Sequence, residues 1–196
     1  MAGREQENDS FRTDGARSMT MNDLQRSAIV AMLVKDCRAR NGFCGETMVQ
    51  KSVFVMQALL KVPLGFDFQL YIYGPYSFDL QHHLGSMMAD DMIAVQPTEY
   101  GATFEPGEQV GYLESHTSKT IATHRSAVEF AVKHLAGRGV KQLERLATAL
   151  YFTVTTDDAS VEGRATKIRE VKPHITADEA QKAVEEVDRW RMELAA

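Results

Sequence analysis

The sequence contains few cysteines, prolines and tryptophans. Its 196 residues include two cysteines, five prolines and one tryptophan. Six residues separate Cys37 from Cys44, whereas about two to four separate the cysteines of a typical zinc-binding pair. We therefore expect two unpaired thiols in a reducing compartment, with a bridge between them as the alternative.

Nothing in the sequence predicts a membrane span or a secretory signal. No apolar run approaches the roughly 20 residues that a transmembrane helix needs. Residues 1–20 are polar and lack the apolar stretch that secretory signals contain, so we expect a cytoplasmic protein. Burial of so few apolar side chains cannot offset the entropy cost of ordering residues 1–20. We therefore predict a flexible tail at 1–20 and a single domain at 21–196.

Positive charge is absent from the middle of the chain. Residues 62–118 hold eight Asp and Glu and no Lys or Arg, a net charge of −8, whereas the whole chain carries −5. Proteins bind DNA through Lys and Arg side chains that face phosphates, so nucleic acid is an unfavourable partner for this segment. Basic side chains before it, at Arg26, Lys35, Arg38 and Arg40, leave DNA binding through another face as an alternative.

The N-terminal half mixes helical and strand patterns. Asn22 as a cap and an apolar face predict a helix over 22–38, and an almost wholly apolar pattern predicts a central core helix over 46–61. Residues 66–73 alternate apolar and polar side chains, which is typical of a half-buried strand that Gly74-Pro75 should end. The elements expected next are a helix capped by Ser77, with Leu80, Leu84, Met87 and Met88 inward, and short strands at 92–95 and 100–104.

The C-terminal part is predicted to be helical throughout. Helices are expected over 119–138, 140–153 and 160–171. The last helix should begin with a capping box that joins Thr176 to Glu179. Its apolar stripe consists of Ala183, Val187, Trp190 and Leu194, which we expect to pack within this chain rather than on a partner.

The order of the elements between residues 46 and 105 suggests a winged-helix arrangement. In that arrangement a helix follows a tight turn, and a two-stranded wing comes after it. We therefore predict an α+β, predominantly helical fold, with a winged-helix-like part at 22–115 and a helical part at 116–196.

Three segments carry a resemblance to a known family. They are QKSVFVMQ at 50–57, FDFQLYIYGPYSFDL at 66–80 and Met92-Ile93. With them the chain resembles the YwgA-like family of small bacterial proteins and, more distantly, the Panacea domain of SocA-like antitoxins, which has a similar YGP turn ahead of a helix. The resemblance covers 22–105 and extends more loosely over 140–190, through 143–150 and Lys172-Pro173. It implies no catalytic residue, and Panacea domains act as antitoxins by binding a protein toxin.

The candidate site is an aromatic cluster around Gly74-Pro75. Tyrosine is enriched at protein interfaces because it supplies a large contact area at low entropy cost. The alternative is that these rings pack the strand onto neighbouring helices. The predicted partner-binding residues are Tyr71, Tyr73, Tyr76, Phe78, Asp79, His82 and His83.

No catalytic or metal-binding pattern stands out. Asp79 and His83 fall one turn apart on a predicted helix, but a zinc site needs about three or four ligands and no third is identifiable. Neither cysteine has the signature of a Cys–His nucleophile. We therefore predict no metal, no cofactor and no enzymatic activity.

These observations predict a protein-interaction module, antitoxin-like or regulatory. Its acidic aromatic surface would dock on a protein partner with a basic surface, and a second copy of the chain is a further partner to consider. The first alternative is a winged-helix transcriptional regulator that binds DNA through residues outside 62–118. The second is an enzyme, which would need a concave pocket with convergent polar groups.

Overall fold

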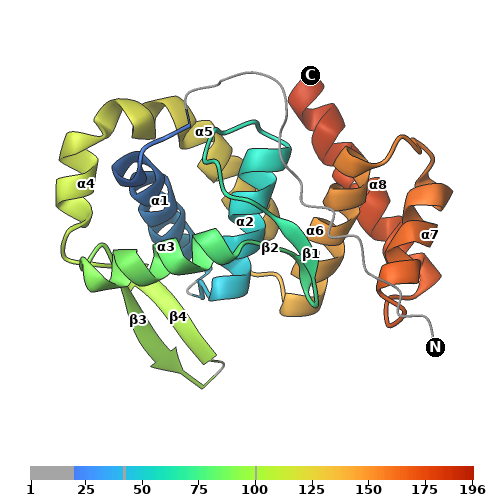
Figure 1. Ribbon diagram of the computed structural model, residues 1–196, viewed down its shortest axis with the longest axis horizontal. Helices are drawn as coiled ribbons and strands as arrows, with labels where there is room; N and C mark the ends of the chain where they lie inside the picture. The colour runs from blue at the N-terminus through green and yellow to red at the C-terminus, as the bar shows by residue number, and fades with distance from the viewer. Residues whose placement is uncertain (1–19, 42, 100) are drawn as a thin grey trace, which may run out of the picture.

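The computed structural model describes residues 20–41, 43–99 and 101–196. The tail predicted at 1–20 therefore lies outside the described residues, apart from Thr20. Figure 1 shows a body of helices with a β-hairpin projecting from one end and the last three helices gathered at the other.

The centre of the molecule is α2 (Glu46–Ala58), in which every residue from Met48 to Ala58 is buried. It packs against α1 (Asp23–Asn41), α5 (Ser118–Leu135) and α6 (Val140–Thr155). The predicted core helix is thus confirmed, although it ends before Lys61, whose φ of 56° lies in the left-handed region. Asn22 caps α1 as predicted, since its side-chain oxygen accepts from the Gln25 N–H at 2.9 Å.

A short hairpin replaces the single strand predicted over 66–73, and that prediction was wrong in extent. β1 (Gln69–Tyr71) pairs antiparallel with β2 (Gly74–Tyr76), which begins where the Gly-Pro pair was expected to end a strand. The Gln57 side chain hydrogen-bonds to both the N–H and the C=O of Phe66, at 3.0 and 2.7 Å. These bonds take the place of strand pairing, so Phe66 is buried outside any sheet.

The segment after this hairpin consists of α3 (Phe78–Ala89), β3 (Ile93–Thr98) and β4 (Gly101–Pro106). Ser77 caps α3 as predicted, because its hydroxyl accepts from the Leu80 N–H at 3.1 Å. Met88 is exposed, so its predicted place on the inner face was wrong. It is next to the inward-facing Met87, and a helix turns by about 100° per residue.

The second hairpin joins β3 to β4, antiparallel from Ile93–Pro106 to Thr98–Gly101, and projects from the helices (Figure 1). The loop before α2 runs beside β4. There the Phe104 N–H donates to the Cys44 carbonyl and the Cys44 N–H donates to the Thr103 hydroxyl, both at 2.8 Å.

The remaining helices are α4 (Val110–His116), α7 (Val161–Val171) and α8 (Ala177–Ala195), together with α5 and α6. The sequence pattern missed α4, which is a short helix that contains Gly111. The capping box at the start of α8 is confirmed by reciprocal bonds between Thr176 and Glu179. Trp190 is buried as predicted, but Leu194 is exposed near the chain end, so its predicted inward position was wrong.

The fold is α+β and predominantly helical, as predicted. The described part of the chain contains two sheets of two strands each. The buried apolar side chains form one continuous cluster that extends from Met21 to Trp190. Over the residues described, no helix combines the length and apolar character that a membrane crossing needs.

Gly107 offers a test of the packing after β4. A Cβ atom at this position would lie 2.0 Å from the carbonyl oxygen of Asp91, so the backbone would have to move. We expect Gly107→Ala to lower the free energy of unfolding by about 1–3 kcal/mol. Gly111→Ala is the matched control because a Cβ on α4 meets nothing within 4 Å, and it should stabilise the helix by up to about 1 kcal/mol. Urea unfolding followed by Trp190 fluorescence measures the stability of both variants. Equal changes in the free energy of unfolding would contradict the close packing of Gly107 against Asp91.

Candidate functional site

Several exposed apolar side chains lie on and next to the first hairpin. Tyr71 is 47% exposed, Ile72 and Tyr73 at the tip are each 60% exposed, and Phe78 at the start of α3 is 42% exposed. We call these four residues the hairpin surface. The strand pattern placed Ile72 inward, which was wrong, because the chain turns at Ile72-Tyr73 and leaves no neighbour to cover that side chain.

Two rings of this surface, those of Tyr71 and Phe78, form an aromatic cluster with Tyr76. The ring centroids are 6.0 Å apart for Tyr71 and Tyr76, 5.7 Å for Tyr71 and Phe78, and 5.2 Å for Tyr76 and Phe78. The Tyr76 hydroxyl donates to a Glu46 carboxylate oxygen at 2.7 Å. Burial and this carboxylate raise the pKa of Tyr76, so its hydroxyl stays a donor.

The start of α2 fixes the second strand of the hairpin. The buried ammonium of Lys51 donates to the Pro75 carbonyl at 2.8 Å. The preceding residue, Gln50, exchanges two hydrogen bonds between its side-chain amide and the backbone of Ser77, at 2.9 and 3.0 Å. The backbone on both sides of Tyr76 is therefore bound to the most buried helix of the protein.

The first strand and the tip are fixed from the other end of the sequence. Lys172, just after α7, donates to the carbonyls of Tyr71, at 2.6 Å, and of Ile72. Glu144 of α6 is also buried, and one of its oxygens lies 3.6 Å from the Lys172 ammonium and 3.2 Å from His174 Nε2. We call Lys51, Glu144 and Lys172 the buried lysine network.

Gly74 brings the hairpin into direct contact with α6. Its φ of +84° lies in the left-handed region, and a Cβ there would be 2.9 Å from the Thr148 hydroxyl and 3.3 Å from the Glu144 carbonyl oxygen. Only glycine suits both the backbone conformation and the space. The turn in the YGP sequence is thus the point at which β2 lies against the helical C-terminal part.

Both lysines of the network are harder to protonate than usual. Burial lowers the pKa of Lys51 to about 8, while the Glu144 carboxylate acts in the opposite direction. Burial also lowers the pKa of Lys172, again opposed by Glu144. Desolvation therefore outweighs the attraction of the shared carboxylate at both positions.

The structure divides the residues predicted for this site into two groups. Asp79 and His82 are exposed on α3, next to the aromatic cluster. His83 is instead half-buried against α1, with its Nε2 3.1 Å from the Ser27 hydroxyl and its ring 5.6 Å from that of Phe66. His83 therefore does not belong to the hairpin surface. Burial lowers its pKa, which favours the neutral imidazole.

The sequence gives little local indication of the buried lysine network. Lys51 lies on a buried helix and Lys172 precedes a proline, but neither feature indicates the hairpin carbonyls that they bind. These lie 24 residues from Lys51 and 100 or 101 residues from Lys172. The one available signal was the presence of a lysine inside the predicted core helix.

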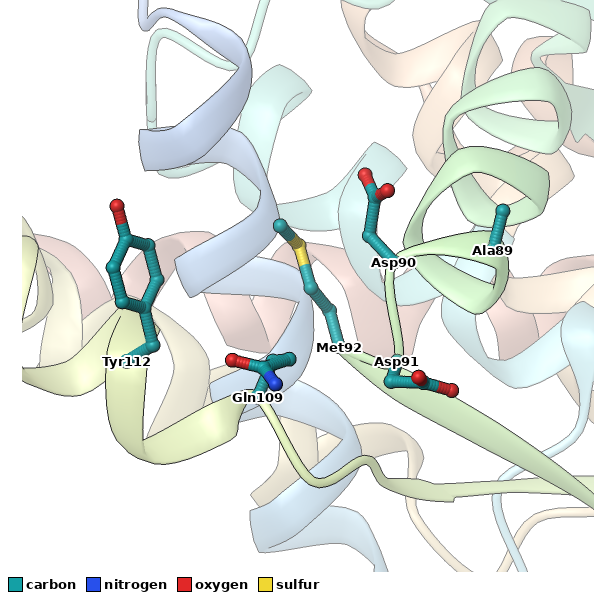
Figure 2. A pocket seen from close by; sticks show the side chains of 6 residues that line it. All are labelled: Ala89, Asp90, Asp91, Met92, Gln109 and Tyr112. Atoms are coloured by element: carbon teal, nitrogen blue, oxygen red, sulfur yellow. The ribbon is translucent and has the colours of Figure 1, made fainter.

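An open pocket of about 310 Å³ lies at the far end of α3, lined by Ala89, Asp90, Asp91, Met92, Gln109 and Tyr112. Figure 2 shows that the carboxylates of Asp90 and Asp91 point in different directions. Within the ranges that the structure describes, no group of at least three His, Cys, Asp or Glu residues could hold a metal ion. This pocket therefore presents no convergent acid–base pair or ligand set.

The sequence matches no model of a known protein family and no curated protein.

Lys51 makes stability depend on pH in a defined direction. Its pKa is about 8 in the folded protein and about 10.4 in an unfolded chain, so between these values the unfolded state binds more protons. Stability contributed by this group must then rise as the pH rises. We expect the free energy of unfolding of the wild type, relative to Lys51→Met, to increase by roughly 2 kcal/mol from pH 7 to pH 10. Urea unfolding at several pH values measures this, and parallel curves would refute it.

Lys172 and Glu144 should be energetically coupled. Lys172→Met removes the donor to two hairpin carbonyls and leaves the buried Glu144 without its ammonium, so we expect a loss of about 2–4 kcal/mol. In the double variant with Glu144→Gln, the total loss should be smaller than the sum of the two single losses by about 1 kcal/mol or more.

The control for this cycle is Lys182→Met, on an exposed pair with Asp178 at 2.7 Å, which should change stability by less than about 0.5 kcal/mol. Additive losses in the Lys172–Glu144 cycle would show that the two groups are not coupled.

Proposed function

We propose that this protein is a non-enzymatic protein-interaction module of the cytoplasm that docks through its hairpin surface onto a partner protein with a basic surface. The observation that carries the proposal is the combination of an exposed apolar tip with a backbone held by buried donors. Tyr71, Ile72 and Tyr73 are about half exposed or more, yet the carbonyls of Tyr71 and Ile72 are bound by Lys172.

Rigid presentation favours binding because a fixed loop loses little conformational entropy when a partner docks. An isolated two-stranded hairpin is marginally stable in water, so this one depends on Lys51, Lys172 and the contact at Gly74. A hairpin that only packed the core would turn its large side chains inward. Here the side chains of Tyr71, Ile72 and Tyr73 are exposed to solvent instead, as interface anchors are.

The charge of residues 62–118 favours a basic partner. Asp79 is exposed beside Phe78, at the hairpin surface, whereas Asp90, Asp91 and Glu108 are exposed beyond the far end of α3. None of these four forms an ion pair with a Lys or Arg of the described residues. By contrast, Glu105 pairs with Arg38 and Glu114 with Lys35. Unpaired carboxylates of one sign speed association with an oppositely charged surface.

The resemblance to Panacea domains suggests that such a module would have an antitoxin-like or regulatory role. In that form the partner would be a protein toxin. Docking of a second copy of this chain is a distinct outcome, which size-exclusion chromatography with light scattering would identify.

A DNA-binding regulator remains the second candidate, because of the order of elements. Helices α2 and α3 precede the β3–β4 hairpin, and the loop at Cys44 pairs with β4, as a winged-helix protein would require. The charge of α3 and its hairpin opposes this function, since residues 62–118 hold no Lys or Arg. DNA bound by another face would dissociate steeply as salt increases.

The partner is best found by pull-down of the tagged full chain from its native cells, with nuclease added to half of the sample. A protein recovered from both halves supports the interaction module. Nucleic acid recovered only without nuclease would favour the regulator.

The decisive variant is Ile72→Ala combined with Tyr73→Ala, because both side chains face solvent and their removal leaves the aromatic cluster intact. We expect the dissociation constant for the recovered partner to rise at least about tenfold, since interface anchors commonly contribute 1–2 kcal/mol or more each. Tyr112→Ala is the control, because Tyr112 is similarly exposed on α4, where it stacks on His116. Unchanged affinity of the double variant, with the fold intact by circular dichroism, would show that the partner docks elsewhere.

A further inference from the structure

The aromatic cluster of Tyr71, Tyr76 and Phe78 combines three rings with two nearby carboxylates. The Phe78 ring lies at 72° to that of Tyr71 and at 73° to that of Tyr76. Tyr71 and Phe78 are nearly half exposed, so a ligand can reach their rings from solvent. Glu46, the first residue of α2, accepts from the Tyr76 hydroxyl, and Asp79 follows Phe78 in the chain.

We propose that this cluster is a binding site for an arginine side chain of the partner protein. The inference rests on the proposed function, because it names a group that the hairpin surface recognises on that partner. An aromatic ring attracts a cation that lies over its face within about 6 Å of its centroid. Since the three centroids are 5.2 to 6.0 Å apart, one guanidinium can lie within that distance of more than one ring.

The carboxylates beside the rings make a cation the favoured occupant. Glu46 and Asp79 are both exposed, and neither forms an ion pair with a Lys or Arg of the described residues. Glu46 uses one oxygen to accept from Tyr76 at 2.7 Å. Over the described ranges its second oxygen accepts no hydrogen bond, so it can accept one from a ligand.

The local charge stays negative in spite of two buried ammonium groups. Lys51 and Lys172 both donate to carbonyls of the hairpin, and the Glu144 carboxylate lies 3.6 Å from the ammonium of Lys172. With Glu46 and Asp79 included, three carboxylates stand against two ammonium groups around the hairpin. A cation that approaches the exposed rings is therefore attracted rather than repelled.

Arginine suits this arrangement better than lysine does. A guanidinium is planar, so it stacks on a ring while its N–H groups donate in pairs to a carboxylate, whereas an ammonium is a compact, strongly hydrated charge. The backbone on both sides of Tyr76 is already held by Gln50 and Lys51. Binding therefore loses little conformational entropy on the side of this protein.

The first test compares three capped tripeptides, Gly-Xaa-Gly, on the full-length wild type. Xaa is arginine, citrulline or lysine, and citrulline has the shape of arginine without its charge. Chemical shifts of the ring protons of Tyr71, Tyr76 and Phe78 report binding. We expect the arginine peptide to shift these signals with a millimolar dissociation constant, and the citrulline peptide to bind at least about fivefold more weakly. Equal binding of citrulline, or tighter binding of lysine, would overturn the proposal.

The second test removes the charge and keeps the rings in place. Glu46→Gln retains an oxygen that accepts from the Tyr76 hydroxyl, and Glu46→Gln combined with Asp79→Asn should raise the dissociation constant of the arginine peptide at least about threefold. The matched control is Asp90→Asn combined with Asp91→Asn, which removes the same charge beyond the far end of α3. Equal weakening by both double variants would show that the net charge, and not this site, attracts the peptide.

The partner recovered by pull-down separates this inference from the proposed function. Weaker partner binding by the Ile72→Ala and Tyr73→Ala double variant, with no arginine preference in the peptides, would refute the arginine site alone. An arginine preference that depends on Glu46 and Asp79 would support the site. If partner affinity were then unchanged in the Ile72 and Tyr73 variant, docking through the hairpin tip would be refuted while the arginine site remained.

Discussion

Two buried ammonium groups determine how this protein presents its first hairpin. Taking a lysine out of water is unfavourable, and the structure compensates by pairing Lys172 with Glu144 and by giving each ammonium a backbone carbonyl to bind. The carbonyls in question belong to Tyr71, Ile72 and Pro75. They lie in a two-stranded hairpin that would be only marginally stable without contacts to the rest of the protein. The position of the hairpin thus depends on side chains from α2 and from the segment after α7.

The same network joins the two halves of the chain. Lys51 lies on the central helix, Glu144 on α6 and Lys172 after α7, and all three converge below the turn at Gly74. The glycine permits this convergence because any side chain at that position would meet Thr148 and the backbone of Glu144. The C-terminal helices and the hairpin are therefore joined by short polar contacts, in addition to the apolar contacts of Leu70 with the core.

The proposed basic partner rests on both shape and charge. The hairpin surface supplies apolar area in a fixed arrangement, and the net charge of −8 over residues 62–118 is unfavourable for anionic surfaces such as nucleic acid. Glu105 and Glu114 pair with Arg38 and Lys35 of α1, so they hold the molecule together. Asp79, Asp90, Asp91 and Glu108 are exposed and form no ion pair with a Lys or Arg of the described residues. An acidic surface with exposed aromatic side chains suits recognition of a basic protein surface.

The sequence by itself determined features that depend on neighbouring residues. The caps at Asn22, Ser77 and Thr176 form bonds within about one turn, so their residue types suffice to predict them. The burial of α2 followed from its apolar pattern, and the α+β class followed from the order of helical and strand patterns. Failures came where local patterns compete with distant contacts, as at residues 66–73, where Gln57 binds the Phe66 backbone and the chain turns at Ile72.

Only the tertiary structure decided which polar groups are buried and what they bind. Nothing in the local pattern of Lys51 or Lys172 distinguishes an ammonium that binds a buried carbonyl from one in solvent, because the partner lies far away in the sequence. The aromatic cluster could be predicted as a group, since Tyr71, Tyr76 and Phe78 are close in the chain. The separation of the predicted site into a half-buried Tyr76, an exposed tip and an inward His83 depended on the packing of α1, α2 and α6.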